Sequence, residues 1–180
     1  MAKVLVLFHS YDGQTRRIAG RIAATLAARG HRVDARSATD PEALATVHAV
    51  DAVVVGSAVR IGRHARLLER ALGAAAQAIG ARPNAFFSVC LSVVGPRPRP
   101  DLIAEANEKL FARSRWTPQQ VANFAGALLY RKYPWPLRLM MRFIVGRAGG
   151  DIDTSRDYEY TDWNAVDRFA AEFAGRLSAT

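Results

Sequence analysis

Hydrophobic positions along the chain alternate between short continuous runs and runs with helical spacing. The first continuous run, KVLVLF at residues 3–8, is followed by turn-like polar residues, which is typical of a buried parallel strand. Over residues 14–29, Ile18, Ile22 and Leu26 recur every four residues with arginines between them. This spacing predicts an amphipathic helix directly after the first strand.

The same alternation continues to the end of the chain. Further strands are predicted at residues 31–36, 52–57, 84–91 and 121–128, and further helices at residues 65–79, 101–113 and 163–177. Apolar strands that alternate with helices need crossover connections, so we expect an α/β fold with a doubly wound, five-stranded parallel sheet. In such a sheet with strand order 2-1-3-4-5, ligands bind beyond the carboxyl ends of the strands at the switch point. The loops after Phe8, Ser57 and Leu91 are therefore the expected site.

Composition narrows the class of protein. The 180 residues, half of them apolar, fit one domain over residues 1–180 with a full core. The one cysteine, Cys90, excludes an intrachain disulfide and is read as a small core residue rather than a redox thiol. The N-terminus shows no cleavable signal, and no apolar run approaches the roughly 18 residues of a spanning helix. We expect a cytoplasmic protein that does not cross a bilayer.

The loop after the first strand carries the clearest binding chemistry. Its polar residues run straight into a helix, where free N–H groups and the positive end of the helix dipole suit a phosphate. The alternative is an ordinary capped turn. Asp12 is expected to point away from the phosphate and cap the helix, because a carboxylate beside a dianion is repelled. The predicted phosphate contacts are Ser10, Tyr11, Asp12, Gly13, Gln14 and Thr15.

Two more loops are predicted to line the same site. After the third strand, glycines at 56 and 62 are expected to let the backbone approach a flat ring, although a flexible connection is the alternative. Backbone groups after the fourth strand are expected to hydrogen-bond the ring edge. The predicted contacts are Ser57, Ala58, Val59, Arg60 and Ile61 in the first of these loops and Ser88, Val89, Cys90 and Leu91 in the second.

The excess of 25 Lys plus Arg over 16 Asp plus Glu, a net charge of +9, indicates an anionic partner. Residues 130–150 contain no acidic residue, and apolar residues at positions 137, 140, 141 and 144 fall on one face of a helix over 136–146. This basic amphipathic insertion after the fifth strand is predicted to contact substrate or a membrane, with a helix that closes over its own core as the alternative. The residues proposed for these contacts are Arg131, Lys132, Arg138, Met141, Arg142 and Arg147, with Arg97 and Arg99 in a stiff Pro-rich loop that is either a substrate rim or a solvated loop.

Several stretches together resemble one family. FHSYDGQTRRIA at the first loop resembles the FMN phosphate loop of flavodoxins, and specifically the opening of bacterial quinone-dependent protoporphyrinogen IX dehydrogenases of the HemG type. The resemblance continues through VVGSAVRIGRH (54–64), FFSVCL (86–91), SRWTP (114–118), FAGALLYRKYPW (124–135), GGDIDT (149–154) and YTDW (160–163). It covers nearly the whole chain and implies a flavodoxin-like fold with FMN as cofactor.

The resemblance further implies a function. It implies FMN-dependent oxidation of protoporphyrinogen IX to protoporphyrin IX in haem biosynthesis, with electrons passed to a membrane quinone, either menaquinone or ubiquinone. The basic insertion separately predicts an anionic membrane surface as a partner, with peripheral attachment to the cytoplasmic face of the inner membrane. Flavin would carry the chemistry, so no catalytic side chain is singled out. The four histidines lack metal spacing, and no metal is expected.

Two alternatives remain open from sequence. One is a flavodoxin-like NAD(P)H-quinone reductase or electron carrier, since the fold alone does not settle function. The other is a basic nucleic-acid-binding domain, which is disfavoured because the arginines cluster with apolar residues and no nucleic-acid motif is present. The sequence also leaves open whether the chain forms a homo-oligomer.

Overall fold

A computed structural model describes residues 1–93, 98–147 and 149–178. Five strands form one parallel sheet in the order β2-β1-β3-β4-β5, which confirms the predicted topology. The strands are β1 (Lys3–His9), β2 (Arg32–Ser37), β3 (Ala52–Ala58), β4 (Asn84–Cys90) and β5 (Val121–Ala125). β1 lies between β2 and β3, so the strand order reverses between β1 and β3, where a ligand site is expected.

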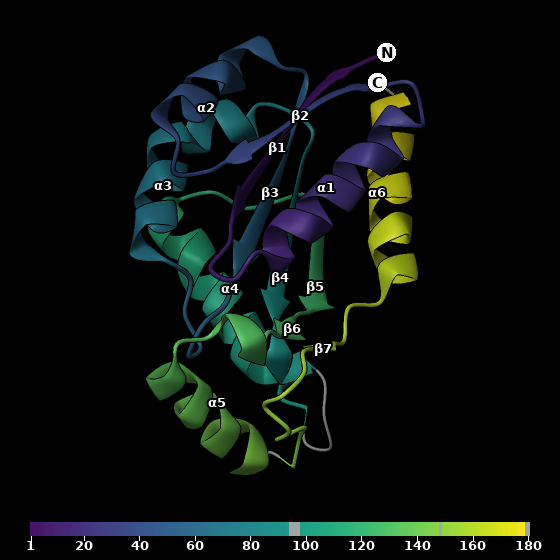
Figure 1. The fold of residues 1–180 in the computed structure, drawn as a ribbon. Coiled ribbons are helices and arrows are strands. Elements are labelled where there is room, and N and C mark those ends of the chain that lie inside the picture. Colours follow the sequence, from purple (N-terminus) through teal and green to yellow (C-terminus); the bar gives the residue numbers. More distant parts are fainter. Residues whose placement is uncertain (94–97, 148, 179–180) are drawn as a thin grey trace.

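Helices cover both faces of this sheet (Figure 1). α1 and α6 pack on one face, and α3 and α4 pack on the other. Their bounds are α1 (Gln14–Ala27), α2 (Pro41–Ala45), α3 (Arg66–Gly80), α4 (Pro100–Ser114) and α6 (Trp163–Ser178). The 3₁₀ turns η1 (Thr46–Ala49), η2 (Leu91–Val93) and η3 (Tyr130–Lys132) lie in the connections. The short α2 and these turns are elements that the sequence pattern did not predict.

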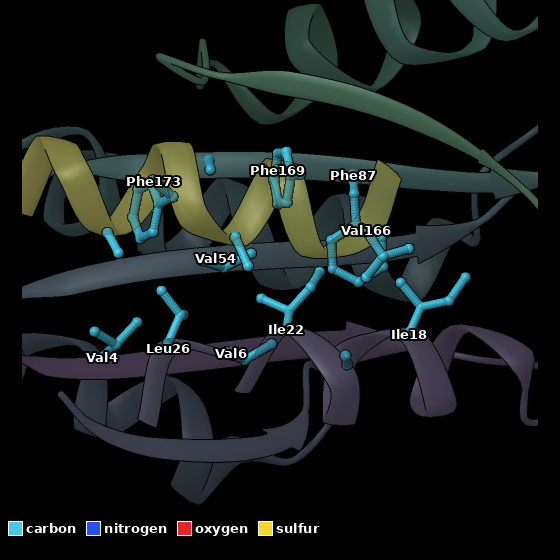
Figure 2. Packing of buried hydrophobic residues seen from close by; sticks show 14 of the residues in the cluster. Val4, Val6, Ile18, Ile22, Leu26, Val54, Phe87, Val166, Phe169 and Phe173 are labelled. Atoms are coloured by element: carbon cyan, nitrogen blue, oxygen red, sulfur yellow. The ribbon is translucent and has the colours of Figure 1, made fainter. Parts of the chain in front are cut away.

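Alternate residues of the strands supply the two cores. Val4 and Val6 of β1 point toward α1 and α6, whereas Leu5 and Leu7 point toward the other face. Figure 2 shows the first of these cores, in which Ile18, Ile22 and Leu26 of α1 meet Val166, Phe169 and Phe173 of α6 over one face of β1 and β3. The four-residue spacing in α1 therefore reports a buried helix face, as predicted.

The predicted fifth strand, residues 121–128, is wrong at its carboxyl end. β5 stops at Ala125, and after Gly126 a separate strand β6 (Ala127–Leu128) pairs antiparallel with β7 (Tyr158–Glu159). Gly126 breaks the strand without breaking the apolar run, so the hydrophobic pattern could not reveal the change of sheet. The site side of the fold thus gains a two-stranded sheet that brings residues 158–161 back to the carboxyl edge.

The predicted basic helix is present as α5 (Trp135–Arg147), but its apolar stripe was assigned to the wrong face in part. Leu137, Met141 and Val145 pack inward on a small core around Tyr130 and Tyr133. Met140 and Ile144 lie outside and are exposed, together with Trp135, Leu139 and Phe143. The helix therefore has apolar residues on an inner and an outer face. Within the residues described, no helix combines the length and apolar character needed to span a membrane.

Candidate functional site

The predicted phosphate segment, Ser10 to Thr15, comprises the loop that connects β1 to α1 and the first two residues of α1, at the switch point of the sheet. Gly13 adopts a left-handed conformation with φ of 98° and precedes the first helical residue, so the N–H groups of the first turn have no partner inside the helix. The Gly13 N–H donates to Ser10 Oγ at 3.0 Å, which leaves the Ser10 hydroxyl proton free to donate elsewhere. No acidic residue lies in the first turn. This donor set fits a phosphate group.

Asp12 does not cap the helix, contrary to the sequence-based expectation. Gly13 is the N-cap, without a side-chain cap, and both carboxylate oxygens of Asp12 accept from Arg60 Nη2, at 2.8 and 3.0 Å. The Arg60 guanidinium also lies over the Tyr11 ring, 4.2 Å from its centre. An ion pair lowers the repulsion that a free carboxylate would exert on a phosphate. Arg60 thereby joins the loop after β3 to the loop after β1.

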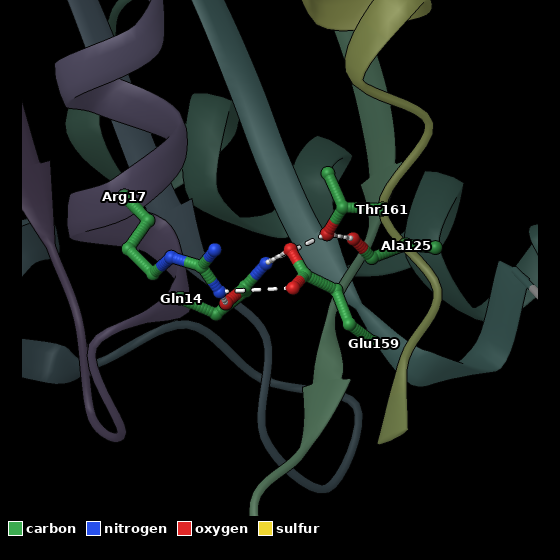
Figure 3. Close-up of polar contacts among 5 residues, drawn as sticks. All are labelled: Gln14, Arg17, Ala125, Glu159 and Thr161. Carbon is green, nitrogen blue, oxygen red and sulfur yellow. Dashed lines mark hydrogen bonds and ion pairs between the residues drawn. The ribbon is translucent and has the colours of Figure 1, made fainter. Parts of the chain in front are cut away.

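Gln14 is turned away from the loop and toward β7, as Figure 3 shows. Its amide Nε2 donates to Glu159 Oε1 and to Thr161 Oγ1, both at 2.9 Å. Arg17 adds an ion pair to Glu159 at 3.0 Å, and the Thr161 hydroxyl donates to the Ala125 carbonyl at 2.8 Å. Gln14 can therefore offer its backbone to the predicted phosphate site but not its side chain. Thr15 is buried, at 2% exposure.

The loop after β3 forms the second predicted wall. Val59 N–H donates to the Val89 carbonyl at 2.9 Å, and Arg60 and Arg63 exchange backbone hydrogen bonds that close the loop on itself. Ile61 at the loop tip is 81% exposed and has a left-handed φ of 51°. Val59 and Arg60 are partly exposed, as is Ala58 at the end of β3. An exposed apolar tip of this kind is available to a ligand.

Gly56 has a different role from the one expected. It lies inside β3, and a Cβ added there would lie 2.1 Å from the Phe87 ring. The glycine is required by a neighbouring phenylalanine in the core and not by a ligand ring. The expectation for Gly56 was therefore wrong, because a glycine in the sequence does not say which group approaches it.

The predicted contacts at the carboxyl end of β4 divide into buried and accessible residues. Ser88 is fully buried, as is Ser57 on the adjacent strand, and each hydroxyl is hydrogen-bonded within the protein: Ser57 with His64 and Ser88 with Asn123. Val89 is also buried, while Cys90 and Leu91 are partly exposed at the sheet edge. Cys90 Sγ lies 3.4 Å from Ser92 Oγ. Only the last part of this segment can meet a ligand without rearrangement.

The predicted substrate or membrane residues occupy different environments. Arg131, Lys132, Arg142 and Arg147 are exposed, and Met141 is half-buried on the inner face of α5. Arg138 is half-buried and donates to the Tyr133 carbonyl at 3.2 Å, which makes it a structural residue of the insertion. Arg99 pairs with Asp101 at 2.7 Å, and Arg97 lies outside the described residues.

The outer face of α5 is an apolar surface beside these arginines. A groove of about 770 Å³ lies along it. Its lining residues are Pro136, Leu139, Met140, Arg142, Phe143, Gly146, Arg147 and Ile152. Arg147 lies over the Phe143 ring, 5.8 Å from its centre. Cationic and apolar groups are thus combined on one exposed surface.

Sequence reasoning missed two groups of residues at the site. The first group connects the start of α1 to β7 and consists of Arg17, Glu159 and Thr161. In the sequence, the polar Thr161 within YTDW was the only indication of this connection. His64 and Asn107 form part of a series of hydrogen-bonded polar side chains below the loops. Burial lowers the pKa of His64 to about 4, against the opposing effect of the hydrogen bond that His64 donates to Asn107, so its imidazole is neutral at pH 7. In the described part of the chain, no cluster of three potential metal ligands occurs.

Comparisons with known proteins agree with this geometry. The Flavodoxin domain family matches residues 5–155. Protoporphyrinogen IX dehydrogenase [quinone] of Escherichia coli strain K12 is 34% identical over 96% of this chain and 94% of that protein, and the protein of the same name from Leishmania major is 32% identical over 96% of this chain and 74% of that protein.

Solved structures show the same fold. Oxidised Flavodoxin 2 from Bacillus cereus superposes with a TM-score of 0.60 at 18% identity, over 97% of this chain and 99% of that chain. A point mutant of flavodoxin from Pseudomonas aeruginosa gives a TM-score of 0.60 at 17% identity, over 98% of this chain and 99% of that chain. The chain therefore belongs to the flavodoxin-domain family, within the branch of quinone-dependent protoporphyrinogen IX dehydrogenases.

Proposed function

We propose that the chain binds FMN and oxidises protoporphyrinogen IX to protoporphyrin IX in haem biosynthesis, with a membrane quinone as electron acceptor. The observation that carries this proposal is the similarity to the E. coli and Leishmania dehydrogenases along almost the entire chain, including the insertion that contains α5. The phosphate-loop geometry supports the cofactor: a left-handed Gly13, an uncapped helix N-terminus and a free Ser10 hydroxyl proton.

The residues of the chain bind and orient the reactants. The first turn of α1 would hold the FMN phosphate through backbone N–H groups, with Ser10 and Thr15 as hydroxyl donors. The loop with Val59, Arg60 and Ile61 would contact the flat ring, and backbone groups at Cys90 and Leu91 would contact its edge. FMN, when bound, supplies two-electron oxidation, which would be used three times for each porphyrinogen.

The insertion would supply the substrate and quinone side of the site. Arg142 and Arg147 border the apolar groove on α5, where cations suit the propionates of a tetrapyrrole and apolar residues suit its macrocycle or a quinone tail. The same surface would attach the protein peripherally to the cytoplasmic face of the inner membrane, because exposed Trp135, Leu139 and Phe143 can enter the interface beside these cations.

One anaerobic assay tests the function. Purified protein loaded with FMN is mixed with protoporphyrinogen IX and either menaquinone or ubiquinone, and porphyrin fluorescence is followed. Quinone-dependent formation of protoporphyrin supports the proposal, and no formation with either quinone contradicts it. A parallel mixture with NADPH should leave the flavin oxidised. Rapid bleaching by NADPH would instead support an NAD(P)H-quinone reductase.

A further inference from the structure

Four buried polar side chains and the exposed Asn123 form a continuous series of hydrogen bonds below the carboxyl ends of β3, β4 and β5. Ser57 Oγ lies 2.6 Å from His64 Nδ1, and His64 Nε2 lies 3.0 Å from Asn107 Oδ1. Asn107 Nδ2 donates to Asn123 Oδ1 at 2.9 Å, and Ser88 Oγ donates to the same oxygen at 2.6 Å. The series thus joins three strands to α4 through side chains alone.

The donor and acceptor of each histidine hydrogen bond follow from the neighbouring bonds. Because the Asn107 amide nitrogen donates to Asn123, its oxygen accepts, and His64 Nε2 must carry the proton. His64 Nδ1 then accepts from the Ser57 hydroxyl. His64 is 5% exposed and packs edge-on against Phe86, with 5.7 Å between ring centres. Both ring nitrogens of a neutral imidazole are thereby used.

The bond between Ser57 and His64 connects the two ends of one loop. Ser57 and His64 flank the loop of residues 58–63, so their hydrogen bond closes the base of that loop. The loop contains Ile61 in a left-handed conformation, which a β-branched residue adopts only when its surroundings impose it. The backbone pair of Arg60 and Arg63 closes the tip.

We propose that His64 is a positioning residue, which holds the 58–63 loop in its flavin-binding conformation before the flavin arrives by bonding Ser57 at the base of the loop and Asn107 on α4. This proposal rests on the proposed FMN site. A loop fixed in advance loses less conformational entropy on binding, so the affinity for FMN is higher than it would be for a mobile loop. The lowered pKa of His64 agrees with this role, since burial keeps the ring neutral. The hydrogen bond with Asn107 and the charge of Glu69 raise the pKa by smaller amounts, and His9 lowers it.

The alternative is that His64 only fills space in the core. Substitutions that keep the packing but remove hydrogen bonds distinguish this alternative from the proposed positioning role. His64→Phe keeps the ring contact with Phe86 and removes both hydrogen bonds. His64→Asn places an amide oxygen near the position of Nδ1, so it can keep the bond to Ser57. Ser57→Ala removes the loop-closing bond and leaves the histidine in place. His48→Gln, on an exposed histidine of η1, is the matched control.

The first measurement is amide hydrogen exchange in the flavin-free protein, compared between residues 58–63 and the β1 core. We expect His64→Phe and Ser57→Ala to exchange at least about tenfold faster in the loop than wild type, with the β1 core less affected. His64→Asn should recover part of the protection, and His48→Gln should match wild type. Equal loop protection in wild type and Ser57→Ala would overturn the proposal.

The second measurement is FMN titration by fluorescence quenching. His64→Phe should weaken FMN binding by about tenfold, which corresponds to about 1.4 kcal/mol, and His64→Asn should weaken it less. Unchanged FMN affinity in His64→Phe would also overturn the proposal. If wild-type protein itself fails to bind FMN, the proposed function fails, whereas the exchange experiment still decides whether His64 fixes the loop.

A third measurement uses the wild-type protein and determines which tautomer of His64 is present. In ¹⁵N NMR spectra of the wild-type protein, His64 should be the neutral tautomer with its proton on Nε2 at pH 6. A ring that is protonated at pH 6, or that has its proton on Nδ1, would contradict the hydrogen-bond direction and with it the closure of the loop by Ser57.

Discussion

Gln14 donates a hydrogen bond of 2.9 Å to Glu159, so the first turn of α1 is fastened to strand β7, 145 residues later in the chain. Arg17 reaches the other carboxylate oxygen of Glu159 at 3.0 Å. The predicted phosphate loop is therefore not held in place by β1 and α1 alone. It is supported by the two-stranded sheet that also holds the inner face of α5, which couples the cofactor site to the insertion.

Glu159→Gln should weaken the protein in a pH-dependent way. Burial alone would raise the pKa of Glu159, but hydrogen bonds from Gln14 and Arg17 lower it below its ordinary value of 4.5. A lowered folded-state pKa gives stability that is present above the unfolded-state pKa and is lost as pH falls through the folded-state pKa. Because the pair is partly exposed, the free energy of unfolding should fall by at most about 1 kcal/mol at pH 7.

Urea unfolding at pH 7 and at a pH below 4 measures this difference. The wild type should have a larger free energy of unfolding than Glu159→Gln at pH 7, and the two values should converge in acid. A difference that grows as the pH falls would show that the ionised carboxylate does not stabilise the contact.

Gly13→Ala should impair both stability and FMN binding. A φ of 98° costs an L-residue about 1–2 kcal/mol, although no atom lies within 4 Å of the added Cβ. The strain should displace the N–H groups of the predicted phosphate site, and adding Thr15→Ala should remove FMN from the purified protein. Gly20→Ala is the control, because Gly20 lies within α1, the helix that Gly13 precedes, and has equally open space and an ordinary φ. Retention of FMN by the double variant would rule out this loop as the phosphate site.

Many of the strands and helices of the fold can be predicted from local hydrophobic patterns in the sequence. The run at Val4–Leu7 and the spacing of Ile18, Ile22 and Leu26 indicate a strand and a helix because burial imposes those periods. The outer face of α5 could not be separated from its inner face, since Met140 and Met141 are both apolar and both fit a helical stripe.

Long-range polar partners could not be predicted at all. Asp12 and Arg60 lie 48 positions apart, and His64 and Asn107 lie 43 positions apart. No periodicity links such residues, so a local rule suggested that Asp12 caps the helix, whereas the tertiary fold provides an arginine. The hydrogen-bonded side chains below the site are ordinary polar residues when taken singly, and they become a group only when the parallel sheet aligns the ends of its strands.

Gly56→Ala should destabilise the core through one contact. The added Cβ would lie 2.1 Å from the Phe87 ring, which is fully buried and cannot move aside freely. Overpacking of this kind typically costs about 1–3 kcal/mol. Phe87→Leu leaves room for the methyl group, so the double variant should be less destabilised than the sum of the two single variants. Additive losses in urea unfolding would show that the clash is relieved elsewhere.

Reversing the charges that border the α5 groove should release the protein from anionic membranes. Arg142→Glu with Arg147→Glu removes two cations, each of which contributes about 1 kcal/mol near an anionic surface, and adds two repelled carboxylates. A combined loss of about 4 kcal/mol lowers the partition coefficient roughly a thousandfold at low salt. Arg138 is left unchanged because its contact with Tyr133 supports the insertion itself.

Arg66→Glu with Arg70→Glu makes the same change in net charge on the exposed side of α3 and provides the matched control. Co-sedimentation with vesicles that contain anionic lipid should separate the two: the α5 variant stays in the supernatant, and the α3 variant sediments nearly as wild type does. Both should keep the wild-type FMN spectrum, because neither pair lies in the predicted flavin loops. If the two variants lose membrane binding equally, attraction depends on total charge and α5 is not the contact surface. If the α5 variant still sediments fully at low salt, the outer face of the helix has another role, and quinone turnover by the variant then tests whether that role is substrate access.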